Sequence, residues 1–167
     1  MRLLELKWGC LIGLAGLIWL YLSYFLGFHT NGIGKIQLMA GLSFMISLVA
    51  YGFALLALVK VEPETSFAEG LKSGGIMAVI AAVIAVLAQF GYFHWINPDW
   101  TDYMMEQTRL HFEAAGMSDE LVEEQVKWAS LNFSLKSYAI QAGLGALVSG
   151  FVFSAILMGM IRYFKTR

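Results

Sequence analysis

Charge is scarce in this sequence. Of its 167 residues only 14% are Asp, Glu, Lys or Arg, whereas 59% are hydrophobic. Soluble domains carry roughly 25% charged residues, so the shortage points to a chain that contacts lipid. Four segments contain no Asp, Glu, Lys or Arg, at about residues 8–29, 36–59, 73–96 and 137–161. Each has the roughly 20 apolar residues that a helix needs to cross a bilayer, which predicts an all-α protein with four membrane spans.

Cysteine is equally scarce, with Cys10 as the one example. A single cysteine excludes an intramolecular disulfide and a two-cysteine redox centre. The first apolar segment is longer than the core of a signal peptide, and no small-x-small cleavage site follows it before Lys35. We therefore expect it to remain in the protein as a membrane span.

The third apolar segment ends at the sequence INPDW (96–100). Pro98 lacks an N–H and disfavours helical geometry at Asn97, so the membrane helix is expected to end there. Asn97 is a good N-cap and Pro98 suits the first helical position, which predicts that a new helix starts at this corner. Trp95 and Trp100 flank the corner, as aromatic residues do at a membrane interface.

The corner opens a polar insert over residues 97–136 with eight acidic and three basic residues. Gly116 fits the position after one helix and Ser118 the N-cap of the next, which predicts a helical hairpin. Its apolar residues recur at helical spacing: Trp100, Tyr103, Leu110 and Ala114 in the first helix, and Val122, Val126, Ala129 and Phe133 in the second. Net acidity disfavours binding to nucleic acid or anionic headgroups.

The distribution of Lys and Arg predicts the orientation of the chain. If both termini are cytoplasmic, seven Lys and Arg residues lie on the inner side and four on the outer side. Cytoplasmic segments carry the excess of basic residues in membrane proteins. We therefore expect cytoplasmic N- and C-termini and an extracytoplasmic hairpin.

Small residues recur at every fourth position near and within the last two spans. They are Gly70, Gly74, Ala78 and Ala82 in one, and Ala142, Ala146, Gly150 and Ser154 in the other. Helices in lipid associate where small residues let two backbones approach closely. The spacing predicts that the third and fourth spans pack together, although Gly and Ala are also simply common in membrane helices.

Five uncharged polar residues within the spans are candidates for polar contacts inside the membrane: Ser43, Ser47, Tyr51, Gln89 and Gln141. A buried amide without a partner is costly, so we expect a hydrogen bond between Gln89 and Gln141 that joins two helices. The alternative is that the five side chains line a small polar cavity. The absence of Asp, Glu, Lys and Arg from the four segments argues against a proton relay or an ion-coupled transporter.

No pattern of residues identifies a reaction. His94 and His111 lie near acidic residues, yet the spacing matches no HExxH helix, no His pair at i and i+4, and no EF-hand loop. His94 is expected at the interface and His111 in solvent. The sequence predicts no catalytic, cofactor-binding or metal-binding residue, and we expect a protein that is not an enzyme.

Several stretches together resemble a family of bacterial membrane proteins catalogued as domain of unknown function DUF4199. They are FAEGLKSG (67–74), INPDW (96–100), GMSDELVEE (116–124) and a last span that carries glycines and ends in a basic tail. The resemblance covers essentially the whole chain. It implies four spans, a helical insert after the third, and the cytoplasmic membrane of a bacterium. It carries over no catalytic residue.

Three functions are open on the sequence alone. The first is a scaffold or accessory protein whose hairpin or small-residue faces bind a membrane-protein partner or a second copy. The second is a transporter or channel subunit for a small neutral solute, with the five polar residues around its cavity. The third is a lipid-modifying enzyme with His94, His111 and nearby acidic residues converging on one pocket.

Overall fold

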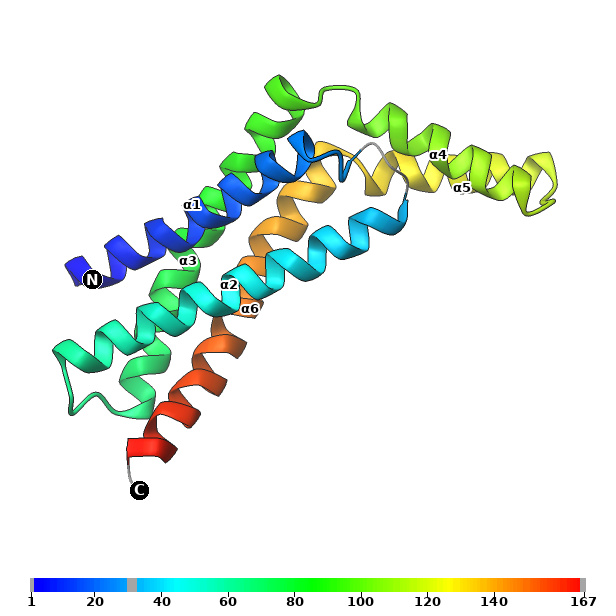
Figure 1. The fold of residues 1–167 in the computed structure, drawn as a ribbon. Coiled ribbons are helices and arrows are strands. Elements are labelled where there is room, and N and C mark those ends of the chain that lie inside the picture. Colours follow the sequence, from blue (N-terminus) through cyan, green and yellow to red (C-terminus); the bar gives the residue numbers. More distant parts are fainter. Residues whose placement is uncertain (1, 30–32, 166–167) are drawn as a thin grey trace.

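The computed structural model describes residues 2–29 and 33–165 and contains six α-helices in this part of the chain (Figure 1). Four are long: α1 (Leu3–Phe25), α2 (Ile33–Val61), α3 (Phe67–Gly91) and α6 (Leu135–Lys165). Two are short, α4 (Trp100–Ala114) and α5 (Asp119–Asn132). A π-helical turn, η1 (Tyr92–Ile96), continues α3.

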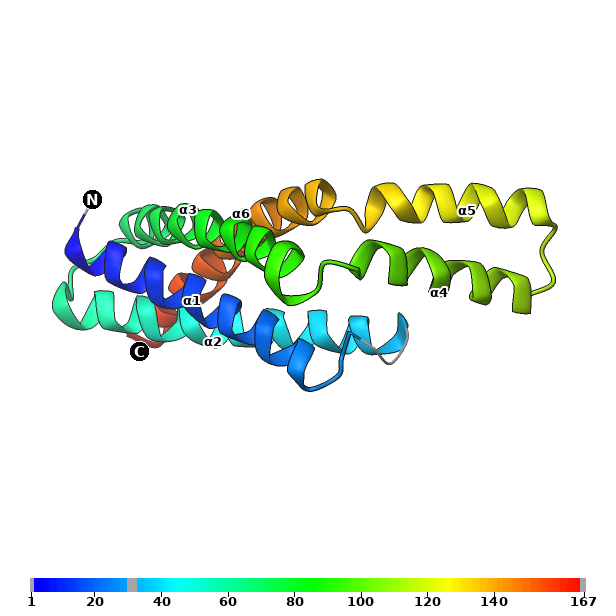
Figure 2. The same cartoon turned by 90° about the horizontal axis from the view of Figure 1, so that it is seen from above.

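The predicted all-α architecture with four candidate spans is confirmed. The apolar stretches long enough to cross a membrane are Leu3–Phe25, Leu38–Val61, Phe67–Ile96 and Leu135–Lys165. The four long helices form a bundle with both described chain ends at one end (Figure 1). The helical pair α4–α5 lies between the third and fourth spans and projects sideways from the opposite end, as Figures 1 and 2 show.

Helices α3 and α6 form the most extensive contact in the bundle, and small residues make it possible. A Cβ atom placed on Gly74 would lie 2.5 Å from Ser154 Cβ, and one on Gly150 would lie 2.5 Å from Ala78 Cβ. Gly70 meets the side chain of Met158 in the same way. The glycines thus let the two backbones approach closely, as helix pairs in lipid require.

Helix α1 packs on the other side of α3, and glycines again allow the close approach. A Cβ on Gly9 would lie 2.8 Å from Ile80 Cβ, and one on Gly13 would lie 2.8 Å from Ile84 Cβ. Both isoleucines therefore fit against bare backbone of α1. Helix α3 is the centre of the bundle, with α1 and α6 against it.

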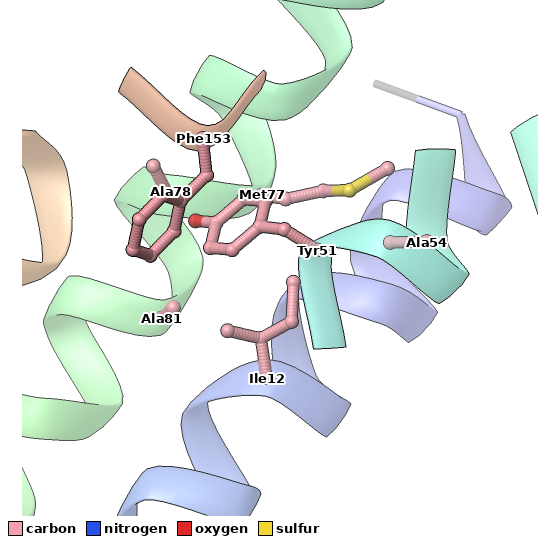
Figure 3. Close-up of a cluster of buried hydrophobic side chains, with 7 residues drawn as sticks. All are labelled: Ile12, Tyr51, Ala54, Met77, Ala78, Ala81 and Phe153. Carbon is pink, nitrogen blue, oxygen red and sulfur yellow. The ribbon is translucent and has the colours of Figure 1, made fainter. Parts of the chain in front are cut away.

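A hydrophobic core fills the space between these helices and α2. Its buried members are Ile12, Tyr51, Ala54, Met77, Ala78, Ala81 and Phe153 (Figure 3). Ala78 is fully buried, and Ala81 is 3% exposed. Of the predicted packing residues, Ala82 is also buried, whereas Ala142 and Ala146 line a cavity described below.

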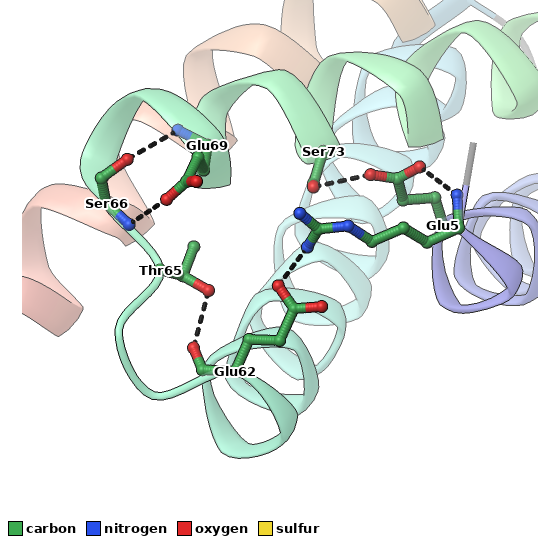
Figure 4. A network of polar contacts seen from close by, with 7 residues as sticks. Glu5, Glu62, Thr65, Ser66, Glu69 and Ser73 are labelled. Atoms are coloured by element: carbon green, nitrogen blue, oxygen red, sulfur yellow. Dashed lines mark hydrogen bonds and ion pairs between the residues drawn. The ribbon is translucent and has the colours of Figure 1, made fainter.

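Polar contacts connect the helices at the end of the bundle where the two termini lie (Figure 4). Glu5 Oε1 accepts a hydrogen bond from Ser73 Oγ of α3 at 2.7 Å, and its Oε2 accepts one from the backbone N–H of Arg2 at 2.8 Å. The Arg2 guanidinium pairs with Glu62 at the end of α2. Ser66 caps α3 through reciprocal hydrogen bonds with Glu69, at 3.2 and 2.8 Å.

The C-terminal residues of α6 hold the same connection between α2 and α3. Arg162 donates to the carbonyl oxygen of Thr65 at 3.2 Å, and Lys165 donates to that of Pro63. Basic residues in the last turn of a helix also suit its negative end. This end of the bundle is therefore tied across all four long helices.

The burial of Glu5 corrects one sequence-based expectation. The first span was predicted to start at residue 8, which left every span free of Asp, Glu, Lys and Arg. Helix α1 starts at Leu3 instead, so the carboxylate of Glu5 belongs to it and is only 3% exposed. It is satisfied by two hydrogen bonds, as a buried carboxylate must be.

The hairpin agrees with the prediction in α5 and differs in α4. Val122, Val126 and Ala129 are buried in α5, and Gly116 between the helices has a φ of 73°, which suits glycine after a helix end. In α4 the buried residues are Trp100, Met104 and Thr108, whereas Leu110 is 49% exposed. The buried stripe therefore follows spacing i, i+4, i+8 from Trp100.

We predict that Gly150→Ala lowers the stability of the bundle by about 1–3 kcal/mol, because the added methyl group overlaps Ala78 and the Tyr51 ring. Thermal unfolding in mild detergent measures the loss. Gly159→Ala is the matched control on the same helix, since nothing lies within 4 Å of the added atom. Equal melting temperatures for both variants would contradict the close approach of α3 and α6.

Candidate functional site

A cavity of about 720 Å³ lies between α1, α2, α3 and α6, in the half of the bundle nearer the hairpin. This volume falls within the range of about 300–1,000 Å³ that is typical of small-molecule sites. Most of its lining is apolar, from residues such as Leu17, Leu20, Ala85 and Val152. None of the described residues that line it is Asp, Glu, Lys or Arg. The cavity can therefore accept an uncharged, largely apolar molecule.

The cavity opens sideways between α2 and α6. Phe44 of α2 and Val148 and Val152 of α6 line it, and yet they are 54%, 62% and 46% exposed. The Phe44 ring packs edge-on against Phe153 of the core, with 4.6 Å between centroids. The cavity thus ends where the core begins, and its open side faces the direction in which lipid would surround the bundle.

Four of the five polar residues singled out in the sequence line this cavity. They are Ser43 and Ser47 on α2, Gln89 on α3, and Gln141 on α6. Ser43 Oγ donates to the Met39 carbonyl oxygen at 3.0 Å, so its hydroxyl hydrogen is already used. The structure places these polar groups on three walls of one space.

Tyr51 does not belong to this set. Its side chain is 1% exposed within the core, where its hydroxyl meets Gly150 and has no hydrogen-bond partner. Its ring packs against Phe153 at a centroid distance of 6.1 Å. Tyr51 is therefore a packing residue, and its expected polar contact is absent.

The expected hydrogen bond between Gln89 and Gln141 is also absent. Gln141 Nε2 donates to Ser137 Oγ on its own helix at 2.8 Å. Gln89 Oε1 is buried without a partner, and no partner is found for the rest of this amide in the described part of the chain. Gln89 is thus an unpaired amide in the wall of a cavity, which is costly unless something else binds it.

His29 forms the end of the cavity nearest the hairpin, and a helix stop places it there. Gly27 follows α1 with a φ of 75°. Its N–H donates to the Tyr24 carbonyl, and the N–H of Phe28 donates to the Ser23 carbonyl, a pattern that ends helices at glycine. The turn directs His29 inward, where its side chain is 3% exposed.

The hydrogen bonds around His29 fix its protonation. Ser23 Oγ donates to the Leu20 carbonyl oxygen at 2.7 Å, so it must accept from His29 Nε2, 3.0 Å away. The ring is then neutral with its proton on Nε2, and Nδ1 accepts from the Tyr92 hydroxyl. Tyr92 in turn accepts from Asn97 Nδ2 at 2.9 Å. One chain of hydrogen bonds therefore joins the end of α1 to the corner after η1.

The aromatic residues at the corner are packed inward. Trp100 is 2% exposed and lies against His29, with 5.3 Å between ring centroids. Tyr92 lies 5.2 Å from the same imidazole. Only Trp95 of the predicted corner residues has the exposed ring of an interface belt, at 82%. Trp100 instead forms a cluster with Tyr92 and His29 that closes the cavity.

Two details of the corner differ from the prediction. The helix ends directly before Asn97, as expected, but Asn97 is not the N-cap of α4. Asp99 occupies that position and Trp100 starts the helix, so Pro98 lies before it. Asn97 instead turns its side chain toward Tyr92, because that buried hydroxyl needs a donor.

His94 and His111 have separate environments. His94 Nδ1 bonds to the Phe90 carbonyl oxygen at 2.9 Å and its ring stacks on Phe90. His111 of α4 contacts the Phe112 ring. Among the described residues, no group of three or more His, Cys, Asp or Glu side chains could hold a metal ion.

Sequence reasoning missed His29. The prediction includes His29 in the first apolar span, although Gly27 in the segment YFLGFH is a recognisable helix stop. A stop at that point would have placed His29 outside the first helix.

We predict that Tyr92→Phe lowers stability by about 1–3 kcal/mol, because it leaves His29 Nδ1 and Asn97 Nδ2 without their partner. Tyr51→Phe is the matched control, since the hydroxyl it removes has no partner. That variant should melt at or above the wild-type temperature. If both variants lower the melting temperature in detergent by a similar amount, the hydrogen bonds that join His29, Tyr92 and Asn97 do not stabilise the protein specifically.

Burial lowers the pKa of His29 to about 4, since no charged group compensates for the loss of water. The neighbours on the described elements around it are Tyr24, Tyr92, Trp100, Ser23 and Met39. An unfolded histidine titrates near 6.5, so the unfolded state binds more protons between about pH 6.5 and 4. Stability is complete above this window and falls as the pH decreases through it.

Lowering the pH from 7 to 5 should therefore destabilise the wild type by about 2 kcal/mol through His29. The comparison is with His29→Gln, whose amide cannot be protonated in this range. Melting curves at both pH values measure the difference between the two proteins. An equal pH dependence would mean that His29 does not titrate as a buried neutral base.

The fold and the cavity together define a class: a multi-pass membrane protein with four candidate spans and a lateral cavity between them. The model of a family described as "Protein of unknown function (DUF4199)" matches residues 7–162, so the chain belongs to this family. No curated protein and no solved structure matches the chain.

Proposed function

We propose that this protein binds a small, mostly apolar molecule that it takes up from the surrounding bilayer. The observation that carries the proposal is the cavity of about 720 Å³, with apolar walls, no charged lining residue in the described part of the chain, and an open side between α2 and α6. Small-molecule sites are typically such apolar spaces with a few polar groups that orient the ligand.

The walls favour a lipid-like molecule over the small polar solute that the polar residues alone would suggest. Leu17, Leu20 and Val152 offer a water-soluble molecule no hydrogen bonds. The polar side chains, among them Gln89 and Gln141, gather toward the hairpin end of the same space. An amphiphile with its polar end at the membrane surface has the same arrangement.

We expect binding without a reaction. His29 is the lining residue best suited to acid–base chemistry, but both of its ring nitrogens are occupied by Ser23 and Tyr92. We propose that the protein lies in the cytoplasmic membrane of a bacterium, with both termini inside and the hairpin outside. The distribution of Lys and Arg in the sequence supports this orientation.

A cavity-filling variant tests the proposal. Gly145 lines the cavity, and a Cβ there would meet nothing within 4 Å, so Gly145→Phe fills the space without a clash at the backbone. Gly159→Phe is the matched control, on the same helix, with equal room and outside the cavity. Both proteins are extracted from membranes with their lipids and weighed intact by native mass spectrometry.

We expect a bound species on the wild type and on Gly159→Phe that Gly145→Phe has lost. Identical bound species on all three proteins would place the binding on the outer surface of the bundle and refute the proposal. A wild type with nothing bound would also refute it.

A second candidate function, as a scaffold or accessory protein, is favoured by the hairpin. Leu121, Trp128 and Leu131 of α5 are 47%, 58% and 67% exposed, and their spacing places them on one side of the helix. Exposed apolar patches of this kind occur at protein–protein contacts. The partner would be another membrane protein or a second copy of this chain.

Crosslinking in mild detergent tests this second function. Trp128→Gln combined with Leu131→Gln should abolish a crosslinked complex that the wild type forms. Leu110→Gln, an exposed site on α4, is the control for a general effect of polarity. A complex that survives the double substitution would exclude this face of α5 as its interface.

A further inference from the structure

The cavity contains two amides on facing helices, Gln89 on α3 and Gln141 on α6. The register between these antiparallel helices follows from three contacts: Gly74 with Ser154, Ala78 with Gly150, and Val86 with Gly143, where a Cβ on the glycine would lie 3.1 Å from Val86 Cγ2. Continued toward the hairpin, this register brings Gln89 and Gln141 to the same level. They are nevertheless not bonded to each other.

The two amides have complementary hydrogen-bonding capacity left over. Gln141 Nε2 uses one of its two N–H groups on Ser137, so this amide can still offer its carbonyl oxygen and one further N–H. Gln89 Oε1 is buried, and the NH₂ of the same amide has no partner among the described residues. The α3 wall therefore offers a donor, and the α6 wall offers an acceptor together with a further N–H.

The remaining polar groups of the lining are largely used. His29 is bonded at both nitrogens, and the Ser43 and Ser149 hydroxyls donate to carbonyl oxygens of their own helices. Trp100 Nε1, at the hairpin end of the lining, is also buried without a hydrogen-bond partner. Within the described chain a neutral polar group can therefore bind through Gln89, Gln141 and this indole N–H. A charged headgroup would be left without a counterion, which is strongly unfavourable in an apolar site.

Resting on the proposed function, we infer that the occupant is an uncharged single-chain amphiphile with a hydroxyl head that bridges Gln89 and Gln141. The hydroxyl accepts from the Gln89 NH₂ and donates to the Gln141 carbonyl oxygen. If the Gln89 amide turns by half a rotation and presents its oxygen, a hydroxyl can still serve it, because it both donates and accepts. The alkyl chain then lies along Leu20, Leu17 and Val152 toward Phe44.

The arrangement also accounts for the missing bond between the two amides. A bridging hydroxyl gives a partner to the Gln89 NH₂ and to the Gln141 carbonyl oxygen at once, which lowers the cost of leaving these two groups unpaired.

Competition for a photoreactive probe tests the inference. The full-length protein in nanodiscs is irradiated with hexadecanol that carries a diazirine on its chain, and crosslinked peptides are identified by mass spectrometry. Unlabelled hexadecanol, its methyl ether, hexadecanoate and hexadecane are then added as competitors. The ether accepts a hydrogen bond and donates none, so we expect it to compete roughly tenfold less well than the alcohol. Hexadecanoate and hexadecane should compete less well still.

Variants provide the second measurement. Gln89→Leu and Gln141→Leu should each reduce the preference for the alcohol over the ether, whereas Gln125→Leu, which removes an amide from the hairpin, should leave it unchanged. If all four competitors suppress the crosslinks to cavity peptides equally, the inferred hydroxyl bridge is wrong. The proposed function would still hold, because an apolar molecule would bind in the cavity while water lies between the two amides. The absence of crosslinks within residues 39–47 and 141–152 would overturn both.

Discussion

The close approach of α3 and α6 determines the rest of the structure. Gly74 and Gly150 bring the two backbones together against Ser154 and Ala78, and a Cβ atom at either glycine would overlap these side chains. Lipid offers apolar side chains as good an environment as the protein does, so close contact rather than hydrophobicity selects this arrangement. Once the register is set, α1 packs on the free side of α3, where Gly9 contacts Ile80 and Gly13 contacts Ile84.

The two ends of the bundle differ as a consequence. At the end with the termini, charged residues from α1 and α6 hold the connection between α2 and α3, and Glu5 is bonded to Ser73. At the other end, α2 stands off from α6, and a cavity replaces the core. Burial of His29 and Trp100 closes that cavity toward the hairpin, so its open side faces lipid. A bundle that is tight at one end and hollow at the other suits a protein that binds a membrane-soluble molecule.

The sequence predicts the architecture well, because span length, charge depletion and turn residues are local signals. The hairpin and its Gly116 turn belong to this group, as does the end of the third helix before Asn97. The small residues at every fourth position also mark the helices that pack together.

The cavity and its lining were harder to predict from the sequence. A list of polar residues cannot separate Tyr51, which is sealed in the core, from Ser47, which lines the cavity, since the two lie one turn apart on α2. The sequence also does not show that the His29 side chain points inward, because this orientation depends on the helix end at Gly27 and on the distant partner Tyr92.

Cysteine crosslinking measures the central contact most directly. In a chain with Cys10→Ser, the pair Val86→Cys and Gly143→Cys probes the register that the structure gives α3 against α6, and Val86→Cys with Leu147→Cys probes a shift of one helical turn. The account predicts that mild oxidation joins the first pair readily in membranes and leaves the second pair largely open. Preferential crosslinking of the second pair would contradict the register, and with it the level at which Gln89 and Gln141 face the cavity.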